Sequence, residues 1–241
     1  MAELLFYQQI KPLDKDQHRH LRIGEIRDFS YAAKTNSVPL TAGEFFEAAR
    51  EYAIVFAGTG DTLLPTALLG LRADENLFIG QQGKWEAHYI PAFVRRYPFV
   101  LAPSKEQMLV CVDEAHPAVG ATQGQALFTQ EGEPTPFLKT VVDFLGRFQT
   151  DAEHTNLFVT RLKELDLLQE VSARAEAQAG GAYQLNGFSV VNEARYRALD
   201  KDVVDELFRK GWIALIDAHL LSLGNIGRLM ERLPAPASAA A

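Results

Sequence analysis

The sequence predicts an α+β fold, with a strand-rich, mostly antiparallel N-terminal half and a helix-rich C-terminal half around an intervening hairpin. Three observations lead to this prediction. Short apolar runs separated by turn residues follow one another up to Val112, apolar residues recur at helical spacing from Phe137 onward, and two further runs flank Gly180 and Gly181. The first connections are too short for crossover helices, so the sheet is expected to be antiparallel.

The N-terminal half begins with a charged segment over 11–28 that is expected to be irregular. Thr41 and Glu44 have the spacing of a capping box, and Phe45 and Phe46 follow them, so a short helix is predicted there. The strands of a meander are then expected at residues 52–56, 63–71, 76–79, 98–101 and 108–112.

A segment rich in glycine and proline over 115–136 lacks apolar periodicity and predicts a loop or an internal boundary. Two amphipathic helices are expected beyond it, over 137–148 and 157–168. A hairpin of 171–177 and 182–191 follows, and it either extends the first sheet or organises a separate C-terminal domain.

The end of the chain predicts two more helices. Asp200 caps the first, which stops at Gly211, and Trp212 begins the last. Gly187 is expected to form a bulge in the preceding hairpin. We therefore expect one domain over 1–233, with a subdivision near 115–136 left open, and a disordered tail over 234–241.

Composition excludes several classes of protein. The chain has 241 residues, and its net charge of −7 argues against a general nucleic-acid binder. The N-terminus lacks the apolar region of a secretory signal, so a cytoplasmic location is expected. The most apolar C-terminal stretch is broken by Asp217, His219 and Asn225, so no membrane span is predicted. His219 is expected to be a hydrogen-bonded packing residue.

Catalytic and cofactor motifs are absent from the sequence. The six histidines are scattered, and no metal-binding, nucleotide-binding or serine-nucleophile motif occurs. The single cysteine, Cys111, lies in an apolar run that predicts a buried strand. We therefore predict no metal and no cofactor, and an enzyme has no support from any motif.

The densest cluster of aromatic and basic residues is Tyr89–Phe99. Pro91 suits the first turn of a helix of about two turns, which Pro98 closes. Arg95 is expected to reach solvent or a partner. Aromatic and arginine side chains are enriched at protein interfaces, which predicts a partner-binding surface. Its candidate residues are Trp85, Tyr89, Arg95, Arg96 and Tyr97. The alternative is that the aromatic residues are core and the arginines are solvated or paired with acids.

A second candidate is the compact group of Asp113, Glu114 and His116, which follows the strand over 108–112. A loop after a strand can gather such side chains into a small-ligand or catalytic pocket. The alternative is an acidic turn, exposed to water, that contains Pro117.

The chain closely resembles the bacterial SapC-type proteins, first associated with surface-layer biogenesis. The resemblance runs through nearly the whole sequence, in blocks that include Ile10-Lys-Pro-Leu-Asp14, Val38-Pro-Leu-Thr41, Tyr89–Phe99, Gly132-Glu-Pro-Thr-Pro136 and His219-Leu-Leu-Ser-Leu-Gly-Asn225. It implies no reaction, cofactor or catalytic residue. Companion genes of the family resemble outer-membrane receptors and flavoproteins, which implies a link to surface-layer, export or uptake systems. The membrane permease that shares the SapC name is excluded, because no spanning segment is predicted.

Three functions remain open from the sequence. The leading hypothesis is an accessory or adaptor protein that binds a protein or peptide partner. The alternative is a small-ligand-binding protein or an enzyme of unknown reaction. A third interpretation is a scaffold that forms homo-oligomers, which exposed apolar faces on Leu157–Leu168 or Trp212–Leu223 would favour.

Overall fold

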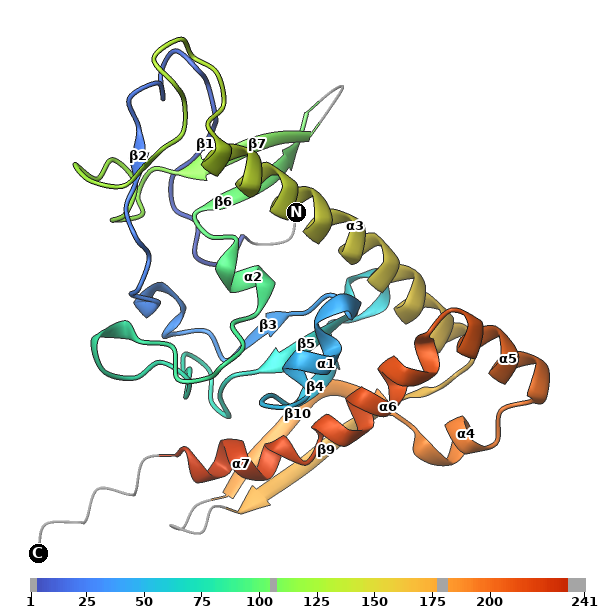
Figure 1. Cartoon of the computed structure of the whole chain (residues 1–241). Coiled ribbons are helices and arrows are strands. Elements are labelled where there is room, and N and C mark those ends of the chain that lie inside the picture. The colour runs from blue at the N-terminus through green and yellow to red at the C-terminus, as the bar shows by residue number, and fades with distance from the viewer. Residues whose placement is uncertain (1–3, 105–107, 177–181, 234–241) are drawn as a thin grey trace, which may run out of the picture.

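The computed structural model describes residues 4–104, 108–176 and 182–233. It shows an α+β fold in which antiparallel sheets dominate the N-terminal half and helices the C-terminal half (Figure 1), so the predicted fold class is confirmed. The predicted tail over 234–241 and the glycine pair at 180 and 181 lie outside the described residues.

The largest sheet joins the two halves of the chain. Its strand order is β3 (Ser37–Pro39), β5 (Leu64–Leu68), β4 (Ile54–Ala57), β10 (Ala182–Val191) and β9 (Leu168–Glu176). Phe188 of β10 lies opposite Ala57 of β4, so the hairpin extends the first sheet. Gly187 has a φ of 81° where the β9–β10 register shifts, which confirms the predicted bulge.

Two smaller sheets lie on the other side of the molecule. One has the order β1 (Ile10–Pro12), β7 (Met108–Asp113) and β6 (Phe99–Pro103), and the other pairs β2 (Arg22–Ile23) with β8 (Gln125–Ala126). The expected single meander is therefore divided between sheets. The segment over 11–28 contains β2 and the end of β1, and the segment over 115–136 contains β8.

The strand expected at 76–79 does not form. Asn76 folds this segment into a turn, because its Oδ1 accepts from the N–H of Phe78 at 2.9 Å and its amide donates to the carbonyl of Ala32 at 3.0 Å. Ile79 makes only an isolated bridge with Trp85.

A single helix, α3 (Pro136–Glu164), replaces the two that the sequence predicts. It begins at Thr135, whose side chain accepts from the N–H of Leu138. The polar stretch over 149–156 contains no glycine or proline, so nothing interrupts the helix. This stretch packs against the segment that contains Ala42, because the Thr155 hydroxyl accepts from the N–H of Ala42 at 2.7 Å.

The remaining helices are short. The α-helices are α1 (Phe45–Ala48), α2 (Ala92–Arg95), α4 (Glu193–Arg197), α5 (Lys201–Arg209), α6 (Trp212–Ser222) and α7 (Asn225–Glu231), and the 3-10 turns are η1 (Ser30–Ala32), η2 (Ala42–Glu44), η3 (Gly60–Thr62) and η4 (Gln81–Gly83). The capping box of Thr41 and Glu44 is present. Asp200 occupies the N-cap of α5 without a capping bond from its side chain, and α2 is one turn rather than two.

The buried apolar side chains form two cores. The main core surrounds the five-stranded sheet and includes Phe56, Phe158 and Ile216. The second core lies beneath the smaller sheets and consists of Ile23, Phe99, Val112, Leu127, Phe128, Leu138 and Leu145. The helix α3 runs diagonally across the molecule and contributes to both cores (Figure 1).

The stretch Trp212–Glu231, which covers α6 and α7, has the length and composition of a membrane span, with a mean hydropathy of 1.2. Core helices pass the same test. In the structure its buried polar side chains bond to the backbone of β4 and of the connection that precedes it. His219 bonds to the carbonyl of Ile54 at 2.9 Å, Ser222 to the N–H of Ile54 at 2.9 Å, and Asn225 to the carbonyl of Tyr52 at 3.0 Å. The expected packing role of His219 is confirmed.

Candidate functional site

Trp85 and Tyr97, two of the five residues predicted to contact a partner, are core residues. Trp85 is 5% exposed and donates its indole N–H to the Tyr52 hydroxyl at 2.9 Å. Tyr97 is 4% exposed and packs edge-on against Tyr7. The prediction that these two side chains belong to an exposed partner-binding surface is therefore wrong, because both rings fill the interior.

Arg95 and Arg96 lie where α2 meets α3, and aromatic rings hold both. The Arg95 guanidinium lies over Tyr89 and Phe144, at 5.6 and 5.3 Å from the ring centroids. The Arg96 guanidinium lies over Phe93 at 4.1 Å and over Phe148 at 5.0 Å. Phe144 and Phe148 are one turn apart on α3, so this helix supplies a ring to each arginine.

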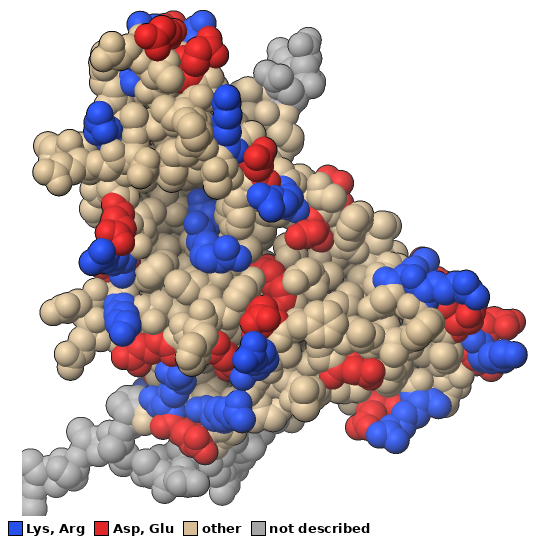
Figure 2. Space-filling model, viewed as in Figure 1, with Lys and Arg blue, Asp and Glu red and all other residues tan. Residues whose placement is uncertain are grey.

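Neither arginine forms an ion pair within residues 4–104, 108–176 and 182–233. Arg95 is exposed and donates its Nε to the carbonyl of Ile90 at 2.8 Å. Arg96 is mostly buried, and this burial lowers its pKa. Basic side chains occupy a hollow on the face of the molecule that Figure 2 shows. Arg95 lines a depression with Tyr97 and Phe99. The Arg95 guanidinium is thus available to an external anion.

Tyr89 connects this corner to η2. Its hydroxyl donates to Glu44 Oε1 at 2.8 Å, and the same carboxylate oxygen accepts from the N–H of Ala92 at 2.6 Å. Glu44 therefore fixes both the η2–α1 turn and the start of α2.

The structure separates Asp113, Glu114 and His116. Asp113 is fully buried, and its carboxylate accepts from the N–H groups of Gln8 and Gln9 at 2.8 Å and from the Tyr97 hydroxyl at 3.0 Å. Burial alone would raise the pKa of Asp113, but these hydrogen bonds and one from Ala115 outweigh it and lower the pKa. Asp113 therefore ties the N-terminal segment to β7 and has no oxygen left for catalysis.

Glu114 points away from this carboxylate, towards Lys11 at 2.5 Å and His18 at 3.2 Å. His116 is 6% exposed and packs edge-on against Tyr97, with 4.9 Å between the ring centroids. The water-exposed turn that was the alternative is thus wrong for Asp113 and His116. Within the described residues, no three side chains of the types that bind metals lie close enough to hold an ion.

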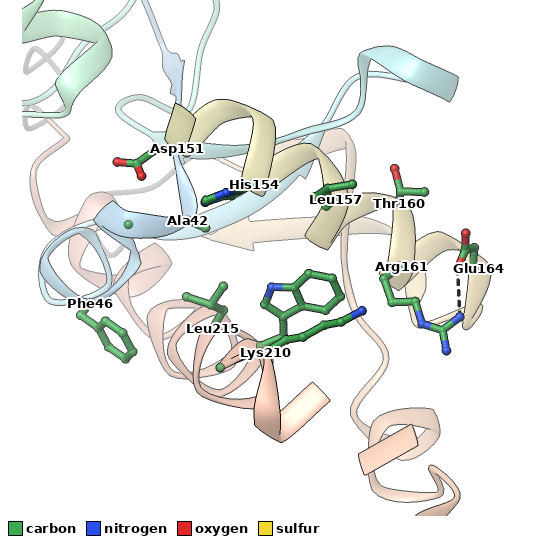
Figure 3. A pocket seen from close by; sticks show the side chains of 13 residues that line it. Ala42, Phe46, Asp151, His154, Leu157, Thr160, Arg161, Glu164, Lys210 and Leu215 are labelled. Carbon is green, nitrogen blue, oxygen red and sulfur yellow. Dashed lines mark hydrogen bonds and ion pairs between the residues drawn. The ribbon is translucent and has the colours of Figure 1, made fainter. Parts of the chain in front are cut away.

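A groove that the sequence did not predict lies between η2–α1, α3 and the start of α6. Its volume is about 750 Å³. Figure 3 shows His154 and Leu157 of α3 facing Lys210 and Leu215, with Phe46 at one end and the Arg161–Glu164 pair at the other. Two of these apolar side chains are largely exposed, Phe46 at 57% and Leu157 at 61%.

Most charged side chains around this groove are paired, and Asp151 is the exception among the described residues. Arg161 contacts Glu164 at 2.9 Å and Glu206 at 2.7 Å, and Lys210 contacts Glu206 at 2.8 Å. The Lys210 ammonium also lies 4.5 Å from the centroid of the Trp212 ring. The groove therefore has an apolar floor, paired charges at the end near Arg161, and the unpaired carboxylate of Asp151 on α3.

A sequence signal for the groove exists in two pairs of adjacent apolar residues. Neighbouring residues on a helix point about 100° apart, so a pair at the margin of the buried face places one member towards solvent. Phe45 and Phe158 are fully buried, whereas their neighbours Phe46 and Leu157 are exposed. Each pair thus places one apolar side chain on the surface.

Comparison with known proteins identifies one family. No curated protein and no solved structure matches the chain. The SapC family model matches residues 13–229, nearly the whole sequence, and the chain therefore belongs to the SapC family.

Proposed function

We propose that this SapC-family protein is an accessory protein that binds a segment of a polypeptide partner in the groove of Figure 3. The observation that carries the proposal is the exposure of Phe46 and Leu157 in one groove. Soluble proteins seldom leave large apolar side chains together in a concave surface unless something covers them. A volume of about 750 Å³ accommodates several side chains of a bound segment.

Arg95 and the rings of Tyr89 and Phe144 that surround it lie next to this groove. Its positive charge favours a partner with an acidic residue. Ala42 and Gly43 line the groove, while the next residue, Glu44, bonds to Tyr89 beneath Arg95. The η2–α1 turn thus separates the apolar groove from an unpaired guanidinium. A segment with apolar residues in the groove and an acidic residue near Arg95 fits both features.

A capture experiment with matched variants tests this proposal. The purified protein serves as bait in lysate of its source organism, and Leu157→Asp is compared with Leu221→Asp. Leu221 is 79% exposed and does not line the groove, so its variant controls for an added surface charge. We expect a reproducible partner that binds the wild type and Leu221→Asp but not Leu157→Asp. Equal capture by both variants would contradict the groove as the site.

Arg95→Ala tests the second contact, with Arg197→Ala as its control. Arg197 is exposed and paired with Glu193 at 2.5 Å, so its loss removes a charge outside the proposed site. We expect Arg95→Ala to weaken capture about tenfold, as loss of a charge-assisted hydrogen bond does. If Arg95→Ala captured the partner as fully as the wild type, Arg95 would not be part of the site. The groove itself would then be tested by Leu157→Asp alone.

A second copy of this chain is the other candidate partner. Leu157 on α3 and Leu221 on α6 are both exposed, on the two helical stretches where the sequence analysis placed oligomer contacts. The molecular mass in solution, measured by light scattering, distinguishes this function. A dimer that Leu157→Asp converts to a monomer would make self-association the use of the groove.

A further inference from the structure

A second pocket, independent of the groove, lies between the turn after β7 and the segment over 24–31. Its volume is about 520 Å³. No residue lines both this pocket and the groove of Figure 3. Three rings form its inner wall: Tyr31 and Tyr97 are 4.6 Å apart between centroids, Tyr97 and His116 are 4.9 Å apart, and Tyr31 and His116 are 5.8 Å apart.

The His116 ring has one nitrogen that the protein does not use. Its Nδ1 accepts from the N–H of Ala118 at 3.0 Å, which places the proton of the neutral ring on Nε2. Among the described residues, Nε2 has no hydrogen-bond partner. The residue as a whole is only 6% exposed, but Nε2 itself is open to solvent. Burial also lowers the pKa of His116, which Asp113 and Asp28 oppose, so the ring is neutral near pH 7. Because His116 lines the pocket, its open Nε2–H group can donate to a ligand oxygen there.

The charges of the pocket select the kind of ligand. Glu25 and Arg27 pair with each other at 2.7 Å and are both exposed. Asp28 lines the pocket without a basic partner in the described part of the chain, and hydrogen bonds from Ser30 lower its pKa, so it is an anion at neutral pH. The lining therefore has a net negative charge, which disfavours a carboxylate or phosphate ligand.

We propose that this pocket binds a small amine that also carries a hydroxyl or carbonyl oxygen. The oxygen accepts from His116 Nε2, and the ammonium group lies near Asp28. The partly exposed ring of Tyr31 contacts the apolar part of the ligand and favours a cation beside it. This site is separate from the polypeptide groove, so either proposal can fail without the other.

Three probes that share one ring test the charge preference on the wild-type protein. They are tyramine, its uncharged analogue para-ethylphenol and its carboxylate analogue phloretate. Binding is measured by titration, with the ring protons of the histidines followed by NMR. We expect tyramine to bind most tightly, phloretate least, and the His116 ring signals to shift on saturation. Absence of saturable tyramine binding, or equal binding of phloretate, would overturn the proposal.

Two variants test the residues. His116→Asn keeps an oxygen able to accept from the N–H of Ala118 but removes the Nε2 donor, and Asp28→Asn removes the charge while keeping an acceptor for the N–H of Ser30. We expect each to weaken tyramine binding about fivefold to tenfold. Asp74→Asn, at an exposed acid outside the pocket, is the control and should bind as the wild type does.

Unchanged tyramine affinity in Asp28→Asn would overturn the proposal even if His116→Asn failed to fold, because Asp28 is exposed and its variant is expected to fold normally.

Discussion

Two of the three buried histidines in the described part of the chain, His116 and His219, lie in different regions of the molecule and form different hydrogen bonds. Beneath α6, His219 is 0% exposed, its Nδ1 contacts the carbonyl of Ile54 at 2.9 Å, and its Nε2 accepts from the N–H of Val191 at 3.0 Å. Beside the segment over 24–31, His116 bonds through one nitrogen only. The region of α6 is thus built for stability, whereas the region of His116 keeps a polar group available. Both side chains are buried, and they differ in the number of ring nitrogens that bond to the rest of the protein.

The largest effect is expected for removal of the satisfied histidine. His219→Ala leaves the N–H of Val191 without its acceptor and opens a cavity next to Phe56, whose ring centroid lies 5.0 Å away. We expect the free energy of unfolding to fall by about 4 kcal/mol. Urea denaturation followed by circular dichroism measures this loss. If His219→Ala lost less free energy of unfolding than His116→Asn, then His116 rather than His219 would be the histidine that matters more for stability.

The second effect is a pH dependence that belongs to His219. Burial lowers its pKa to about 4, from 6.5 in the unfolded chain. Between these values the unfolded chain binds more protons than the folded one, so stability is complete above pH 6.5 and falls as the pH drops towards 4. The loss is about 3 kcal/mol for this shift. Denaturation at a series of pH values should show a shallower decline for His219→Ala than for the wild type, and parallel declines would contradict this assignment.

An intermediate effect is expected at Asp113, which sharpens the distinction between a structural and a binding group near His116. Asp113→Asn replaces one acceptor oxygen by a donor that faces an N–H or hydroxyl group, so we expect a loss of about 2 kcal/mol. Hydrogen exchange should become faster at Gln8 or at Gln9, because these N–H groups bond to different oxygens of Asp113 and the variant keeps only one oxygen. Unchanged protection of these two amides would mean that the carboxylate does not hold the N-terminal segment.

The smallest effects on stability are expected at the proposed contact residues. Leu157→Asp and Arg95→Ala alter exposed side chains, so each should change the free energy of unfolding by less than about 0.5 kcal/mol. Thermal denaturation of both variants is the measurement. A large loss would place these side chains among the structural groups, and any loss of partner capture would then reflect unfolding.

The fold class was predictable because local patterns determine it. The capping box at Thr41, the bulge at Gly187 and the helix stop at Gly211 each depend on neighbours in sequence, and all three are present. The division of the strands between sheets was not predictable, since it depends on pairings such as that of Ile10 with Asp113. The continuity of α3 was missed because a polar stretch reads as a connection, although Thr155 packs against Ala42.

The candidate sites were predictable only in their residue types. Arg95 and Arg96 stand out in the sequence, but the rings that hold them, Phe144 and Phe148, come from α3 nearly fifty positions later. His116 was noticed for its acidic neighbours, whereas its surroundings in the structure are Tyr31 and Tyr97. Contacts between distant segments decide which face each side chain occupies, and spacing along one segment carries no information about them.

The length of α3 sets the relative orientation of the two cores. Leu138 and Leu145 belong to the second core, and Phe158 and Leu162 belong to the main core, so one rigid rod carries anchors for both. Each residue inserted between these anchors would advance one core by about 1.5 Å and rotate it by about 100° relative to the other. One or two extra residues near Gly146 would therefore turn the second core away from its partner sheets, whereas three or four would return it close to its original heading. Only a few lengths of α3 therefore keep both cores in their present relative orientation, so the number of residues between its anchors is a structural constraint on the fold.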